Sequence, residues 1–106
     1  MFRITIDEFG NPAEETDRLE FRLESSNALS VRELIHRTVA EEIRLRGLKV
    51  SVAKLTDHQR EATRAFARGT FVMLVSGKPM TDIESVLPAD DEREIFFIRV
   101  LPLVGG

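Results

Sequence analysis

Apolar and polar residues alternate in two segments near the start of the chain. In residues 2–7 the apolar positions hold Phe and Ile, and residues 19–24 repeat the pattern with Leu and Phe against Glu and Arg. Such alternation is typical of a β-strand with one buried and one solvent-facing side. Gly10, Asn11 and Pro12 supply turn residues between the segments. We therefore expect an antiparallel hairpin at the start of the domain.

A segment with helical periodicity follows. Ser30 and Glu33 match a capping box, in which the Ser30 hydroxyl accepts the Glu33 N–H and the Glu33 side chain reaches back. Gly47 can supply a left-handed cap at the other end. One helical stripe, with Glu42 as its only charged member, contains Val31, Leu34, Ile35, Thr38, Val39, Glu42 and Ile43. These features predict a long amphipathic helix.

The region between this helix and the next apolar run predicts an insertion. Alternating apolar residues at 48–53 indicate a short strand or an extended connection. Thr56 and Gln59 offer a second capping box, and a helix from there through Arg68 would end at Gly69. Its apolar stripe is narrow and consists of Ala62, Ala65 and Phe66. We expect a surface helix held in place by its single aromatic residue.

The last third of the chain predicts two more strands. Residues 71–75 form a continuous apolar run, typical of a strand buried on both faces or an interior strand. Residues 76–79 predict a turn, residues 81–94 an irregular segment with an acidic cluster, and residues 95–100 the final strand. The order of elements predicts an α+β fold with a mixed sheet. The handedness of crossovers lets the final strand lie parallel to the first, in the middle of the sheet.

Composition excludes several classes of protein. The 106 residues, 42% hydrophobic and 31% charged, suit one globular domain. No apolar run approaches the roughly 20 residues of a membrane span, and the immediate first strand leaves no room for a signal peptide. The absence of cysteine excludes disulfides and thiol chemistry of the chain's own. We expect a cytoplasmic protein that does not bind membranes.

Charge argues against a nucleic-acid partner, since the formal net charge is −3. The distribution is uneven, because residues 32–68 contain nine basic and five acidic residues. Both a solvated helical surface and a docking surface for an acidic partner explain this basic segment.

Catalytic and metal-binding patterns are absent from the sequence. His36 and His58 are the only histidines, and neither has ligand spacing with a second His or with paired carboxylates. The acidic residues at 90–94 lack EF-hand spacing. No serine has a recognisable base in a catalytic motif. We expect no metal, no bound cofactor and no enzymatic activity.

The chemistry that the sequence offers lies in its last six residues. Pro102 cannot continue a central strand, because it lacks an N–H. Gly105 and Gly106 carry no Cβ, so the α-carboxylate is not surrounded by side chains. A carboxylate becomes an electrophile when it is adenylated, and an enzyme that adenylates a chain terminus must admit it through a narrow channel. Gly106 would then be the reacting residue, and the residues recognised by the channel would be Leu101, Pro102, Leu103, Val104 and Gly105.

Three passages resemble the ubiquitin-like, β-grasp superfamily, and the resemblance covers essentially the whole chain. Residues 30–35, SVRELI, resemble the start of its long helix; residues 71–80, FVMLVSGKPM, are similar to its strand–turn passage; and residues 95–106, IFFIRVLPLVGG, resemble its closing strand and Gly-Gly tail. The resemblance implies a β-grasp sheet crossed by one long helix, with a second, short helix inserted. It divides the chain into a domain over residues 1–100 and a flexible tail over residues 101–106.

The resemblance also implies a function. The inserted helix is similar to that of prokaryotic sulfur carriers, the molybdopterin-synthase small subunit and the thiamine sulfur carrier, and to that of ubiquitin-like proteins of bacterial conjugation operons. Sulfur carriers typically have a Gly-Asp-Glu turn before the last strand and paired prolines before the tail, whereas this chain has residues 89–94, ADDERE, and Pro102 alone. These differences favour a conjugated modifier. A sulfur carrier with a C-terminal thiocarboxylate and a non-covalent interaction module are the alternatives.

The implied partners are enzymes of a conjugation pathway. A ThiF-like or ubiquitin-activating enzyme would supply ATP and Mg²⁺ and adenylate Gly106, and the acyl group would pass through a partner cysteine to a target. A conjugating enzyme and a deconjugating protease would complete the pathway. If the protein forms chains, the lysine acceptors would be Lys49, Lys54 and Lys78, the only lysines present.

Overall fold

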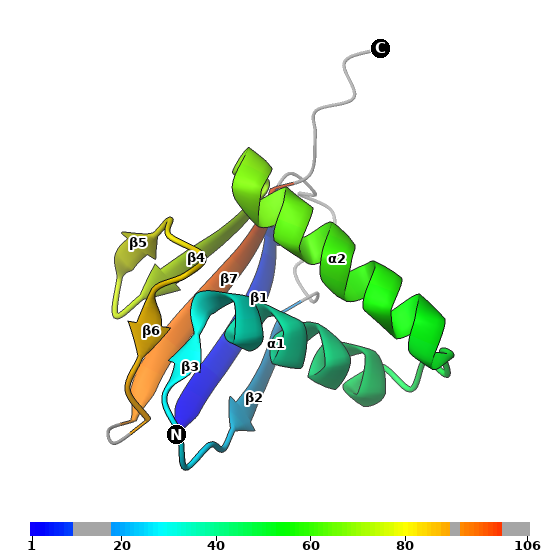
Figure 1. Cartoon of the computed structure of the whole chain (residues 1–106), viewed down its shortest axis with the longest axis horizontal. Helices are drawn as coiled ribbons and strands as arrows, with labels where there is room; N and C mark the ends of the chain where they lie inside the picture. Colours follow the sequence, from blue (N-terminus) through cyan, green and yellow to red (C-terminus); the bar gives the residue numbers. More distant parts are fainter. Residues whose placement is uncertain (10–17, 90–91, 101–106) are drawn as a thin grey trace.

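The computed structural model describes residues 1–9, 18–89 and 92–100 of the chain, which form an α+β fold with a mixed sheet and two helices (Figure 1). In this part of the chain neither helix has the length and apolar character needed to cross a membrane. The elements are, in order, β1 (Phe2–Phe9), β2 (Leu19–Leu23), β3 (Leu29–Ser30), α1 (Val31–Leu45), α2 (Val52–Arg68), β4 (Phe71–Val75), β5 (Lys78–Met80), β6 (Val86–Leu87) and β7 (Arg93–Val100).

The main sheet has five strands in the order β2-β1-β7-β4-β5. β1 and β2 pair antiparallel, which confirms the predicted pairing of the hairpin strands, whereas the predicted turn at Gly10, Asn11 and Pro12 lies outside the described residues. β7 lies in the middle of the sheet and runs parallel to β1, from Phe2 opposite Arg93 to Phe9 opposite Val100. This confirms the predicted place of the final strand, which also pairs antiparallel with β4.

The core lies between one face of this sheet and the two helices, which cover the same side in Figure 1. Successive strand residues point to opposite faces, so every second residue of each strand enters the core. Phe71 of β4 and Phe97 of β7 stack there with ring centroids 4.9 Å apart and planes 11° apart. The fully buried side chains of β1 are Phe2, Ile4 and Ile6.

Helix α1 forms as the sequence predicts. Glu33 N donates to the Ser30 hydroxyl at 3.1 Å, and Ser30 N donates to the Glu33 carboxylate at 3.3 Å. Gly47 has φ 71°, a left-handed conformation that the absence of a Cβ makes inexpensive. Leu48 N then donates to Ile43 O at 3.1 Å, the bond that closes a Schellman motif. Six members of the predicted stripe are buried: Val31, Leu34, Ile35, Thr38, Val39 and Glu42.

The predicted start and length of the second helix are wrong. α2 begins at Val52 and has 17 residues, two more than α1 with 15, so it is not the short helix of the prediction. Ser51 is the N-cap, because its hydroxyl accepts Lys54 N at 3.2 Å. Thr56 lies inside the helix, where its hydroxyl donates to Val52 O. The alternation at residues 48–53 therefore belongs to a loop and a first helical turn.

The turn and the irregular segment predicted after β4 are partly wrong as well. Ser76 and Gly77 alone form the turn, with φ 50° and 83°, the two positive values that a type I′ hairpin requires. The next residues form β5, which includes Pro79 and lies at the edge of the sheet, where a missing N–H is tolerated. Within residues 81–94, β6 pairs with β3 as a separate two-stranded sheet, and β7 begins at Arg93.

The two faces of β7 provide a test of this core. Phe97 is fully buried against Phe71, so Phe97→Ala should lower the free energy of unfolding by about 3–5 kcal/mol. Phe96 points to the opposite face and is half-buried, so Phe96→Ala should lower it clearly less. Urea unfolding of both variants measures the difference, and equal losses would contradict this arrangement of the strand.

Candidate functional site

The six residues that carry the predicted chemistry, Leu101, Pro102, Leu103, Val104, Gly105 and Gly106, lie outside the described residues. The structure does describe the residue from which they continue. Val100 ends β7, its N–H donates to Thr70 O at 2.8 Å, and its partner on β1 is Phe9. The main chain is thus held as far as Val100 by β1 on one side and by Thr70 on the other. Val100 itself is 40% exposed.

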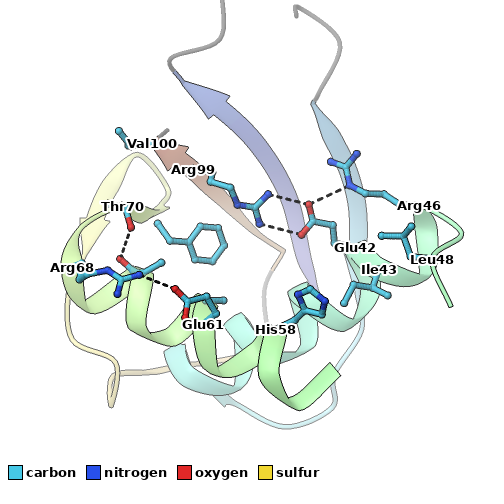
Figure 2. A pocket seen from close by; sticks show the side chains of 13 residues that line it. Glu42, Ile43, Arg46, Leu48, His58, Glu61, Arg68, Thr70, Arg99 and Val100 are labelled. Atoms are coloured by element: carbon cyan, nitrogen blue, oxygen red, sulfur yellow. Dashed lines mark hydrogen bonds and ion pairs between the residues drawn. The ribbon is translucent and has the colours of Figure 1, made fainter. Parts of the chain in front are cut away.

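A partly buried ion pair lies beside this point. The Arg99 guanidinium donates to both carboxylate oxygens of Glu42, at 3.2 and 3.3 Å. Arg46 Nε donates to Glu42 Oε2 at 3.3 Å, so one carboxylate binds two guanidinium groups (Figure 2). The Glu42 side chain is only 10% exposed, and those of Arg99 and Arg46 are about one-third exposed. The guanidinium of Arg99 also lies 5.4 Å from the centroid of the Phe71 ring, within cation–π range.

The sequence places both charges of this pair on core-facing positions. Ile95 and Phe97 enter the core from β7, and the alternation of the strand puts Arg99 next on the same face. On α1, Glu42 continues the buried stripe after Val39. A charge in such a place needs a partner of opposite sign and hydrogen bonds, and each of the two residues provides these for the other. The ion pair therefore lies at the edge of the apolar core, next to the last residues of β7.

A groove of about 700 Å³ opens next to the ion pair, between the end of α1, one face of α2 and the end of β7 (Figure 2). Its apolar lining comes from α1, α2, β4, β7 and the loop after α1, and its charged lining from both helices and β7. The lining residues are Glu42, Ile43, Arg46, Leu48, His58, Glu61, Ala62, Ala65, Arg68, Thr70, Phe71, Arg99 and Val100. A mostly apolar concavity with a few charged groups is typical of a binding site.

A second, smaller depression of about 320 Å³ lies between the two helices and is lined by Arg32, His36, Thr56, Gln59, Arg60, Thr63 and Arg64. His36 Nε2 and the Thr63 hydroxyl are 3.2 Å apart, and Gln59 Nε2 donates to His36 O at 3.0 Å. Partial burial, and then the positive charge of Arg32, lower the pKa of His36 from its ordinary value of 6.5. These contacts fasten α2 to α1.

The face of the sheet opposite the helices carries a patch of half-buried apolar side chains from β4 and β7. Val72 pairs with Ile98 across the β4–β7 ladder, and Leu74 pairs with Phe96. Arg18 lies over the Phe96 ring, with 5.8 Å from its guanidinium carbon to the centroid. The continuous apolar run of β4 is thus explained by an interior strand with a buried face and a second, half-buried one.

The structure places the three lysines in two regions. Lys49 lies in the loop between the helices and Lys54 in the first turn of α2, whereas Lys78 is at the start of β5, on the other side of the molecule (Figure 1). All three are exposed. In the described part of the chain, no three His, Asp or Glu side chains gather closely enough to hold a metal ion.

Sequence reasoning did not find the ion pair or the groove. A signal for the pair was present, since Glu42 is the only charge in one buried stripe and Arg99 follows two core residues in alternation. These two charged residues in otherwise apolar patterns can be recognised as a pair only when it is known that the end of α1 lies next to the end of β7. The groove had no comparable signal, because its lining combines residues from five separate segments.

Comparison with known protein families, with curated proteins and with solved structures found no match for this chain.

The ion pair predicts a large difference between two adjacent glutamates. Glu42→Gln leaves two guanidinium groups without their counter-charge and should lower the free energy of unfolding by about 2 kcal/mol. Glu41→Gln is the matched control, because Glu41 forms an i,i+3 pair with exposed Arg44, and such pairs contribute little. Urea unfolding measures both changes, and an equal or larger loss for Glu41→Gln would contradict the assignment.

His36 predicts a loss of stability in mild acid. Its folded pKa is lowered, so below pH 6.5 the unfolded chain binds the proton more readily than the folded one, and stability falls until pH passes the folded pKa. His36→Gln should remove this part of the fall between pH 7.5 and 5.5, whereas His58→Gln should retain it. Free energies of unfolding at the two pH values give the test, and an unchanged fall in His36→Gln would refute the role of His36.

Proposed function

We propose that this chain is a β-grasp, ubiquitin-like protein modifier of a cytoplasmic conjugation pathway, activated at the carboxylate of Gly106. One observation carries the proposal. β7 pairs with β1 in parallel at the middle of the sheet and is held there as far as Val100, immediately before the sequence Leu-Pro-Leu-Val-Gly-Gly. Support for the β-grasp fold comes from the same pairing together with α1, which crosses one face of a mixed sheet after an N-terminal hairpin (Figure 1).

The proposed chemistry is an acyl transfer in three steps. A carboxylate oxygen of Gly106 attacks the α-phosphorus of ATP, and pyrophosphate leaves to give an acyl adenylate. A thiolate of the activating enzyme attacks the acyl carbon, AMP leaves, and a thioester forms. The amine of a target then attacks the thioester, the thiol leaves, and an amide bond remains. The activating enzyme supplies ATP, Mg²⁺ and the cysteine, since this chain contains none. The chain is therefore a substrate, and it requires a free carboxylate on Gly106.

The residues before Gly106 have separate proposed roles. Gly105 gives clearance for the carboxylate in the active site, because any side chain there would occupy the channel. Leu101, Pro102, Leu103 and Val104 provide the apolar surface by which the channel holds the segment. The exposure of Lys49, Lys54 and Lys78 supports their use as acceptors in chains of the protein.

A second candidate function is a non-covalent interaction module of the same fold. The half-buried apolar patch on the face opposite the helices, with Val72, Leu74, Phe96 and Ile98, favours it, because such patches often mark contact surfaces. The two functions differ in their need for Gly106.

The test uses the purified protein, ATP, Mg²⁺ and a ThiF-like or ubiquitin-activating enzyme from the same genome. We expect ATP–pyrophosphate exchange and, by mass spectrometry, a thioester between the two proteins. Deletion of Gly106 should abolish both, and Gly105→Val should reduce exchange by about 100-fold or more, since a misplaced reacting group loses about that factor.

Further measurements distinguish the candidate functions. Phe96→Ala changes the apolar patch and should leave exchange intact, whereas an interaction module would lose partner binding with Phe96→Ala and keep it without Gly106. A mass in which sulfur replaces a terminal oxygen would assign a sulfur carrier instead. Wild-type exchange in the protein that lacks Gly106 would refute the proposed function.

A further inference from the structure

Exposed apolar side chains of the described residues gather at the α1–α2 junction and reach the groove beside the ion pair. Six large apolar residues are exposed in the described part of the chain, and four of them, Leu45, Leu48, Val50 and Val52, lie at the junction of α1 and α2. A fifth, Val100, is at the end of β7. Leu48 and Val100 themselves line the groove, at its two ends. Apolar surface gathered around a concavity in this way indicates a contact surface for another molecule.

The charges around the groove favour an acidic occupant. Arg46, Arg68 and Arg99 contribute three guanidinium groups to its lining, against the two carboxylates of Glu42 and Glu61. The Glu42 carboxylate is buried and shared by Arg46 and Arg99, so these three groups together carry a net charge of +1. Arg68 is 59% exposed at its side chain and reaches Glu61 at 2.9 Å, an exposed pair that a stronger partner can replace at small cost.

The floor of the groove accommodates an apolar side chain. Ala62 and Ala65 face it from α2, and their small side chains leave room between Ile43 on α1 and Phe71 on β4. Leucine-sized groups bury well in such a space, with carboxylates on either side able to reach Arg46 and Arg68 at the rim (Figure 2).

The distance to Gly106 connects the groove to the proposed activation. Val100 lines the groove, and the six residues after it span at most about 21 Å when fully extended. Any enzyme that holds Gly106 in its active site therefore has surface within about that distance of the groove.

We propose that this groove receives an apolar side chain flanked by carboxylates, presented by the enzyme that activates Gly106. The inference rests on the proposed function for the identity of the partner, and on the groove alone for the chemistry of the contact. It assigns the basic middle of the chain a docking role through α1 and α2.

The first experiment tests the chemistry without any enzyme. The probe is a blocked five-residue peptide with a central leucine between two aspartates on each side, titrated into the ¹⁵N-labelled protein. We expect saturable shifts of the amide signals of Leu48, Ala62, Ala65 and Val100. A peptide with lysines in place of the aspartates, and one with serine in place of leucine, should each bind at least about fivefold more weakly.

Two pairs of variants locate the contact. Arg68→Glu should weaken binding of the acidic peptide by about fivefold, and Arg64→Glu, on the same helix with a similarly exposed side chain, should not. Leu48→Asp should weaken it by about tenfold, whereas Val86→Asp, at a residue of similar exposure on β6, should leave it unchanged. In the activation assay, Leu48→Asp should raise KM by a similar factor with kcat unchanged, because the contact binds ground state and transition state alike.

The outcomes separate this inference from the proposed function. If the acidic peptide binds and no enzyme adenylates Gly106, the proposed function fails while the chemistry of the groove stands. If Gly106 is adenylated with the wild-type KM in Leu48→Asp and Arg68→Glu, the docking role is overturned and the proposed function stands. Equal binding of the acidic and basic peptides overturns the inference. Concentration-dependent shifts of the groove amides without peptide overturn it too, in favour of a second copy of the chain.

Discussion

The parallel pairing of β7 with β1 is the constraint on which the other features depend. Eight residues of each strand are in register, from Phe2 and Arg93 to Phe9 and Val100, and they occupy the middle of the sheet. Because β1 begins the domain and β7 ends its described part, this contact joins the two most distant parts of the sequence. It also fixes which residues of β7 face the helices. The positions of Phe97, Arg99 and Val100 all follow from this one register.

The Glu42–Arg99 ion pair shows how the core ends. Between the sheet and the helices, apolar side chains fill the space as far as Phe97 and Val39, and the next core-facing residue on each element, Arg99 and Glu42, is charged. A pair of this kind contributes modestly to stability, because the desolvation of both groups offsets much of their attraction. It does, however, hold α1 and β7 in a defined relation at the point where the candidate groove and Val100 meet. The main effect of the ion pair is therefore to fix the position of α1 relative to β7.

Local patterns in the sequence predicted much of the fold, and long-range contacts account for the errors. The capping box at Ser30 and the alternation in residues 2–7 involve neighbours in the chain, so α1 and β1 could be predicted. Residues 48–53 alternate, but no strand pairs with them in the described part of the chain. Ser51 caps α2, so the last two of these residues belong to the helix. The two-residue pairing of β3 with β6 is too short to leave a pattern. Likewise, Glu42 and Arg99 could be paired only once the topology was known.

The central claim is that the chain is held in the sheet as far as Val100, so that the residues after it continue from a fixed point. Hydrogen exchange of backbone amides under native conditions measures this directly. The account predicts that the amides of Ile95 and Phe97 exchange with the free energy of global unfolding, and that the Val100 amide, bonded to Thr70 O, is strongly protected. Exchange of Val100 at the rate of an unfolded chain, with β4 still protected, would contradict it.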